Sequence, residues 1–205
     1  MDIEQSTLIW LMRLAFFAFA LLMTFGVWGF MRRERLVTVP QKSEYQPPKH
    51  IKLPEKNIVL LVSAKPGRIL DNLKLFKAMH ELGFQFAEKN HVFEYVVPNT
   101  NDIAFSVING RPPNTFESDP KKMPPTSTLI AVMQLPVGDG DNQVQYFHLL
   151  RSVLDEICRK LDADLCDIHK NLMKDKKFYE MQKEIETFEQ SYTALIQNDY
   201  RQHHN

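Results

Sequence analysis

Residues 129–135 read LIAVMQL, an apolar run that ends at Pro136. Two similar runs precede it in the chain, residues 58–62 (IVLLV) and residues 103–108 (IAFSVI). Short apolar runs of about four to eight residues, bounded by turn residues, are typical of buried strands. The three runs therefore predict the centre of a β-sheet.

Around these strands the apolar residues recur with helical spacing. A first helix is predicted after residue 67, and Gly83 is expected to end it because glycine adopts the left-handed conformation easily. A second helix is predicted after residues 138–141, with apolar residues recurring from Phe147 to Leu161. Two short strands at 84–86 and 91–97 and a further one at 164–168 complete the sheet. The order is strand and helix, several strands, then helix, strand and helix, which predicts an α+β domain with a mainly antiparallel sheet.

The last helix carries apolar residues at alternating intervals of three and four: Phe178, Met181, Ile185, Phe188, Tyr192 and Leu195. This spacing also occurs in coiled coils, but the stripe is short and its aromatic residues are bulky for such a seam. We expect this helix to pack on the sheet. The segment before the second helix, residues 139–142 (DGDN), lacks the spacing of a calcium loop and predicts a turn with Asp141 or Asn142 as the helix N-cap.

The three central runs are apolar on both faces of the expected strands, whereas an antiparallel sheet usually has one wet, polar face. Three helices can all lie on one side of the sheet, which would leave the second face apolar and uncovered. An exposed apolar patch usually marks a partner site. The alternative, in which helices cover both faces, stays open at this point.

Composition and motifs argue against an enzyme and against a general nucleic-acid binder. The 25 Lys+Arg balance 25 Asp+Glu, whereas a nucleic-acid binder needs surplus positive charge to displace counterions. The 2 cysteines, Cys158 and Cys166, are too few for a disulfide framework, and we expect them to be buried small hydrophobic residues. Phosphate loops, nucleophile motifs and paired histidine ligands are missing, so we expect no catalytic residue, no metal and no cofactor.

Residues 8–31 predict a transmembrane helix. The stretch 14–31 has no charged residue, and about 20 apolar residues suffice to cross a hydrocarbon core. Arg13 lies near one end, where its side chain can reach the interface. A cleavable signal peptide would need basic residues in front and a small-x-small site behind, but the leading segment is acidic and no such site follows.

Three arginines, Arg32, Arg33 and Arg35, follow this span, and positive charge is retained on the cytoplasmic side of a membrane. We therefore expect residues 1–7 to be periplasmic and the rest of the chain to be cytoplasmic. Residues 32–56 form a basic flank and a proline-rich linker. An extended linker of about 20 residues spans roughly 60 Å at ~3.1 Å per residue. The folded domain is expected at 57–200, with a polar tail at 201–205.

Several strings in the body carry a family resemblance. They are Gly83-Phe84-Gln85-Phe86, then Phe105-Ser106-Val107 with Asn109 and Thr115-Phe116-Glu117, then Met133-Gln134-Leu135-Pro136. In this order, behind an N-terminal anchor, an Arg-Glu-Arg flank and a spacer, the chain resembles the ZipA family of bacterial cell-division proteins. The resemblance covers nearly the whole chain.

The resemblance implies a split β-α-β domain, with a six-stranded antiparallel sheet and three helices on one face. The other face would form a shallow apolar groove that receives the C-terminal tail of FtsZ. Alignment of the strings places the groove positions at Val62, Lys89, His91, Ile108, Gly110, Pro112, Ile130 and Val132.

The implied function is that of an inner-membrane adaptor at the division site. It would tether and stabilise FtsZ filaments, and so support Z-ring assembly and septation, with many weak contacts adding up along a polymer. Filaments would also be bundled if the adaptors self-associate. The alternative is an adaptor of the same fold for a different cytoplasmic peptide. Lys89 and His91 motivate it, because they stand where the family tends to have large apolar residues and would favour an acidic tail.

Overall fold

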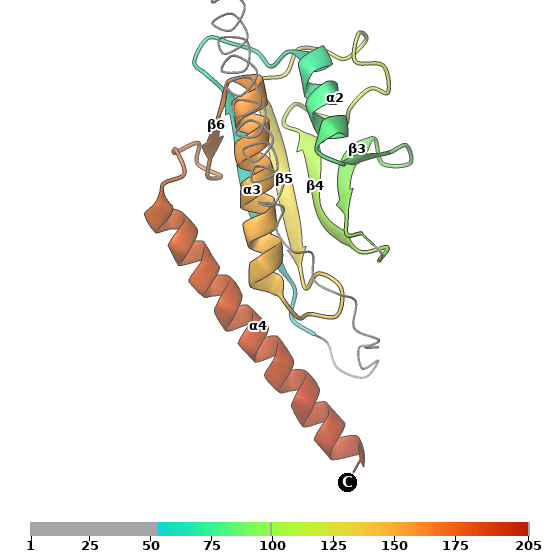
Figure 1. Ribbon diagram of the computed structural model, residues 1–205, viewed down its shortest axis with the longest axis vertical. Helices are drawn as coiled ribbons and strands as arrows, with labels where there is room; N and C mark the ends of the chain where they lie inside the picture. The colour runs from blue at the N-terminus through green and yellow to red at the C-terminus, as the bar shows by residue number, and fades with distance from the viewer. Residues whose placement is uncertain (1–52, 99, 205) are drawn as a thin grey trace, which may run out of the picture. The chain divides into compact units, whose positions relative to one another are not determined.

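The computed structural model describes residues 53–98 and 100–204 (Figure 1). All of them belong to one compact unit of the chain, Val39–Asn205. The predicted membrane segment at 8–31, its arginine flank and most of the linker lie outside the described residues. None of the helices in the described part of the chain combines the length and the hydropathy that a membrane crossing requires.

Six strands form one antiparallel sheet in the spatial order β2-β3-β4-β5-β1-β6. The strands are β1 (Lys56–Ala64), β2 (Gln85–Ala87), β3 (Val92–Val96), β4 (Ile103–Asn109), β5 (Thr128–Leu135) and β6 (Ala163–Cys166). The three apolar runs of the sequence become β1, β4 and β5, which are interior strands. The predicted centre of the sheet is thereby confirmed.

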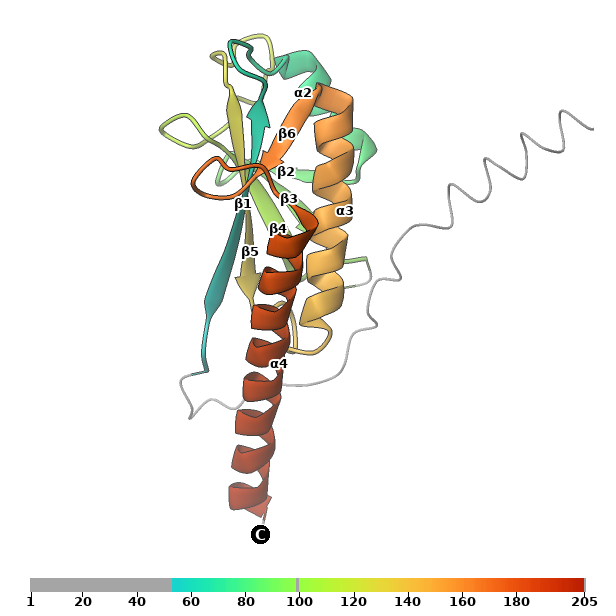
Figure 2. The same cartoon turned by 90° about the vertical axis from the view of Figure 1, so that its left-hand side faces the viewer.

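Three helices complete the described fold: α2 (Asn72–Glu81), α3 (Gln143–Leu161) and α4 (Asp175–His204). Figure 2 shows all three on the same side of the sheet, while on the opposite side the described residues form loops. The side chain of Asp71 begins α2 by accepting hydrogen bonds from the backbone N–H groups of Leu73 and Lys74. Gly83, at φ +87°, follows the end of α2 as predicted.

The core lies between the sheet and α3, which packs over β1, β4 and β5. Aromatic rings join α2 to the β2–β3 end of the sheet. The ring of Phe76 lies 5.0 Å from that of Phe93, which in turn lies 5.1 Å from that of Phe116 in the loop between β4 and β5. These edge-to-face contacts attach that loop to the helix-covered side.

Helix α4 packs beside α3, and it also reaches β1, where its Glu184 forms an ion pair with Lys56 at 2.7 Å. Its buried residues, Phe178, Ile185 and Tyr192, recur every seven residues. The ring of Phe178 lies 6.2 Å from that of Phe147 on α3, and the guanidinium of Arg151 lies 4.1 Å from its centroid. The coiled-coil-like spacing thus serves a contact between two helices of one domain.

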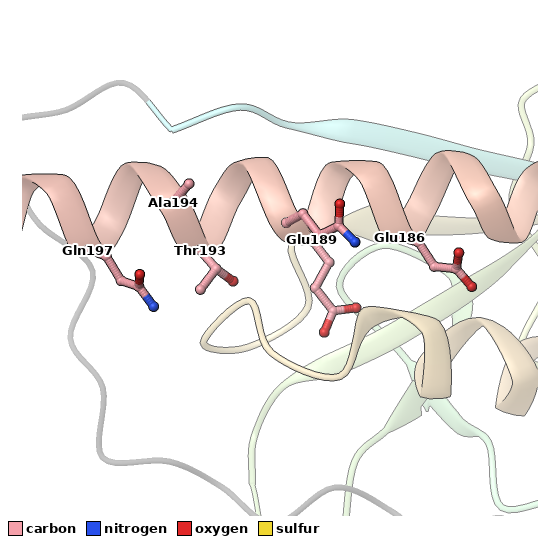
Figure 3. Close-up of a pocket in the computed structure, with 6 residues that line it drawn as sticks. Glu186, Glu189, Thr193, Ala194 and Gln197 are labelled. Atoms are coloured by element: carbon pink, nitrogen blue, oxygen red, sulfur yellow. The ribbon is translucent and has the colours of Figure 1, made fainter.

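The N-terminus of α3 has an unusual cap. Asn142 holds the N-cap position, as one of the two expected residues, but it adopts φ +60° and its side chain makes no capping bond. Instead, Glu189 of α4 accepts hydrogen bonds from the backbone nitrogens of Asn142 (3.0 Å) and Val144 (3.4 Å). Figure 3 shows this side chain extending from α4 toward the start of α3. A carboxylate here also interacts favourably with the helix dipole.

Candidate functional site: the uncovered face of the sheet

The strand register assigns every strand residue to one of the two faces, because directly opposed residues of antiparallel strands point to the same side. On the helix-covered face Leu60 of β1 opposes Ala131 of β5, and both are almost completely buried. Their neighbours Val59 and Val132 oppose each other on the other face and are half-buried. Burial along β5 alternates from Thr128 to Leu135 in the same way.

We call the side without helices the open face. Its strand residues, from β2 to β6, are Gln85, Ala87, Val92, Glu94, Val96, Ile103, Ser106, Ile108, Thr128, Ile130, Val132, Gln134, Asn57, Val59, Leu61, Ser63, Asp164 and Cys166. The sequence had left open whether helices cover both faces, and the described residues answer that one face has none (Figure 2).

Apolar residues of the open face form a continuous row across the strands. Ala87 opposes Val92, and Ile130 opposes both Ile108 and Leu61. Val92 adjoins Ile108, because the residues next to them, Phe93 and Val107, are opposed. The opposed pair Val132 and Val59 lies beside this row on the same face. We call the row and this pair together the apolar band: Ala87, Val92, Ile108, Ile130, Leu61, Val132 and Val59.

Polar pairs border the apolar band on both sides. Asn57 opposes Gln134 on one side, and Ser63 opposes both Thr128 and Asp164 on the other. The band crosses the strands from β2 to β1, and strands are spaced about 4.8 Å apart, so it is roughly 19 Å long. It consists of at most two rows of residues, about 7 Å apart along each strand, and is therefore a narrow strip.

A loop limits the band at its β6 end. Cys166 is bridged to Leu172, and the backbone N–H of Met173 donates to the carbonyl of Leu165 at 2.9 Å, so the chain turns back along this edge of the sheet. Figure 2 shows this loop, drawn in orange, projecting on the open side. Ile168 and Leu172 in the loop are each 60% exposed. They add apolar surface beside the band.

Three of the predicted groove residues meet on the open face. Ile108 and Ile130 oppose each other directly, and Val132 lies two residues farther along β5. Gly110 continues beside them, its N–H donating to the carbonyl of Thr128 at 2.8 Å. A Cβ on residue 110 would lie 2.6 Å from the same oxygen. The backbones of β4 and β5 can therefore come this close only because residue 110 is glycine.

Val62 does not belong to the open face. It opposes Leu129 and Leu165 and is fully buried under the helices. Neighbouring residues of a strand point to opposite faces, so Val62 and its neighbour Leu61 lie on different sides of the sheet. The residues that β1 contributes to the apolar band are Val59 and Leu61. Nothing in the pattern IVLLV distinguishes its two faces, which is why the sequence missed these two residues.

The other predicted positions lie in loops. Lys89 and His91 are in the turn between β2 and β3, and Pro112 is exposed in the loop after β4. The ring of His91 lies 6.0 Å from that of Phe86, on the side of the aromatic cluster, and its Nδ1 is 3.2 Å from the carbonyl oxygen of Phe116. His91 therefore holds the β4–β5 loop and is not part of the band.

The hollow along α4, the possible metal ligands and the two cysteines are weaker candidates for a functional site among the described residues. A hollow of about 460 Å³ runs along α4 and is lined by a mainly polar set, Glu186, Glu189, Gln190, Thr193, Ala194 and Gln197 (Figure 3). Within residues 53–98 and 100–204 no three His, Cys, Asp or Glu side chains gather as metal ligands. Burial raises the pKa of the Cys158 thiol to about 12, and it also raises that of Cys166, so neither is a reactive thiolate at neutral pH.

Comparison with protein families agrees with this architecture. Residues 56–184 match the family described as ZipA, C-terminal FtsZ-binding domain. The matched segment runs from the first residue of β1 into α4 and so contains the whole sheet and the apolar band. This family is a binding domain of a division adaptor, not a known enzyme family. The match covers more than half of the sequence, and the chain therefore belongs to the family of the ZipA C-terminal FtsZ-binding domain.

Proposed function

We propose that this protein tethers FtsZ filaments to the inner membrane at the division site by holding the C-terminal tail of FtsZ on the apolar band. Membership of the family supports FtsZ binding in cell division. The observation that carries the proposal is the uncovered apolar band itself. Six of its seven apolar side chains are half-buried and accessible, Leu61 alone is buried, and polar pairs border the surface.

Binding to such a strip is driven by burial of apolar surface. Each apolar side chain that a peptide covers contributes at about 25 cal/mol per Å² of area removed from water. Part of this gain is offset by the ordering of a peptide that is free in solution. A single tail therefore binds weakly. A filament presents many tails to many adaptors, and this multivalency makes the attachment strong.

The membrane part of the proposal is supported by sequence outside the described residues. The apolar segment at 8–31 and the following Arg32, Arg33 and Arg35 support an inner-membrane anchor with the domain in the cytoplasm. The linker that follows keeps the domain within roughly 60 Å of the lipid surface. Self-association of the adaptors would add filament bundling to tethering.

The proposal is tested by fluorescence anisotropy of the full chain in detergent micelles, with a labelled C-terminal tail peptide of FtsZ from the same organism. We expect saturable binding that Val132→Glu or Ile130→Glu abolishes. Leu195→Glu, which places the same charge at an exposed apolar position of α4, serves as the control and should bind as the unchanged chain does. Circular dichroism confirms that each variant is folded.

Absence of saturable binding at high micromolar concentration of the unchanged chain would contradict the proposal. Equal loss of binding in the α4 control would show that added negative charge, and not the band, is responsible. The alternative of a different, acidic peptide partner was motivated by Lys89 and His91. Neither residue lies on a strand of the open face.

A further inference from the structure

The ionisable side chains on the strands of the open face are both acidic. They are Glu94 on β3 and Asp164 on β6. The basic residue at the start of β1, Lys56, lies on the helix-covered face and pairs with Glu184 of α4 at 2.7 Å. Lys65, just beyond the other end of β1, is neutralised by an ion pair with Asp162. The strands themselves thus contribute only negative charge to the open face.

Glu94 is the acidic residue that lies closer to the accessible part of the band. It opposes Gln85 on one side and Ser106 on the other, and Ser106 opposes Val132 of the band. Val92, also in the band, precedes it by two residues on the same face of β3. Glu94 is half-buried, and among the residues that the structure describes its carboxylate has no hydrogen-bond or ion-pair partner.

A peptide on the band would remove water from this carboxylate. A carboxylate that loses water without gaining a partner destabilises the complex, whereas a cationic side chain of the peptide would restore the lost interaction. An unpaired charge at the border of an apolar surface therefore discriminates between ligands. Resting on the proposed function, we propose that Glu94 is a specificity determinant that selects tails carrying Lys or Arg next to their apolar residues.

A carboxylate beside the band favours a cationic ligand, which is the opposite of the preference suggested by Lys89 and His91. His91 is engaged with Phe116 on the other side of the domain, and Lys89 stands in a turn beyond the end of the band. Glu94, by contrast, belongs to the same row of opposed residues as Val132 and Val59. A peptide on the apolar band would therefore lie next to the carboxylate of Glu94 and not next to Lys89 or His91.

The test uses the full chain in detergent micelles and a labelled FtsZ tail peptide, together with peptides in which each Lys or Arg is replaced singly by Gln. On the unchanged chain we expect one such replacement to weaken binding about fivefold at low salt and less at high salt. Glu94→Gln should weaken binding of the native tail to a similar extent and abolish the difference between that pair of peptides. Glu94→Lys should prefer a peptide with Glu at the same position.

The control is Glu180→Gln on α4, which changes the net charge equally on the helix-covered side and should leave every affinity unchanged. If Val132→Glu abolishes binding but no peptide charge matters and Glu94→Gln binds as the unchanged chain does, the specificity role is overturned while tail binding stands. If no tail peptide binds the unchanged chain, both proposals fail. The peptide series on the unchanged chain needs no variant to fold.

Discussion

Gly110 is fixed by the space between two backbones. A Cβ there would lie 2.6 Å from the carbonyl oxygen and 2.9 Å from the Cβ of Thr128, and neither atom is the end of a flexible side chain. We predict that Gly110→Val lowers the free energy of unfolding by about 1–3 kcal/mol, because β4 and β5 must separate. Urea unfolding measures it, with the exposed neighbour Ser127→Val as the control. An unchanged midpoint would mean that the strands can shift here without strain.

Two valines of β1, Val59 and Val62, should differ in their effects on stability and on tail binding. Val62 is fully buried under the helices, whereas Val59 is half-buried on the open face. We expect Val62→Ala to cost about 2 kcal/mol of stability with unchanged tail affinity in the folded protein. Val59→Ala should instead weaken tail binding with little loss of stability. Thermal unfolding and fluorescence anisotropy on the same samples separate the two, and a reversed pattern would contradict the assignment of the faces.

At the residue scale, alignment with the family named Ile130 and Val132 as groove positions, and the register places both on the open face of β5. In β1 every position from 58 to 62 is apolar, and the choice between Val62 and its neighbours depends on the register with β5 and β6. That register forms only in the folded sheet. The role of His91 likewise depends on a contact 25 residues away.

At the scale of elements, α4 completes the domain beyond the segment that matches the family. The match ends at residue 184, yet Glu189 caps α3 and Tyr192 is buried. A Cβ on Gly140 would overlap the Tyr192 ring, so the turn before α3 fits closely against this helix. Sequence spacing predicted the helix, and three residues of its apolar stripe, Phe178, Ile185 and Tyr192, are buried, whereas Leu195 is exposed. The spacing could not identify α3 as the partner, because a stripe fits a helix or a sheet equally well.

The cap on α3 gives a prediction for Glu189. Glu189→Ala removes the acceptor of two backbone N–H groups, and we expect a loss of about 1 kcal/mol in the free energy of unfolding. Gln190→Ala, the exposed neighbour on the same helix, is the matched control. Urea unfolding should give a lower midpoint for the first variant only. Equal midpoints for both would show that water replaces the carboxylate without loss.

The loop after β6 should respond to acid. The Asp167 carboxylate accepts hydrogen bonds from the backbone N–H groups of Asn171 and His169, both at 2.9 Å, and the bond from Asn171 contributes most to holding its pKa below the ordinary value of 3.8. A lowered pKa in the folded state means that the stabilisation is fully present above pH 3.8 and is lost as the pH falls through the lowered value. We expect the amide signals of His169 and Asn171 to titrate in that window. In Asp167→Asn they should not titrate there.

At the scale of the whole molecule, the fold and the proposed anchor together predict how tightly a filament is held at a membrane. The sheet presents one narrow band, and if it binds the tail as proposed, a band of this size would hold a single tail weakly. If the segment at 8–31 anchors the chain, many bands face one filament, and dissociation requires that all of them release together. We therefore predict that FtsZ filaments bind supported bilayers carrying the full chain at least about a hundredfold more tightly than the isolated tail binds one chain.

Surface plasmon resonance on such bilayers measures the affinity of the filament and that of the isolated tail, and bilayers carrying the Val132→Glu variant are the control. Filament and tail affinities that agree within a few-fold would show that the chain does not act by multivalent tethering.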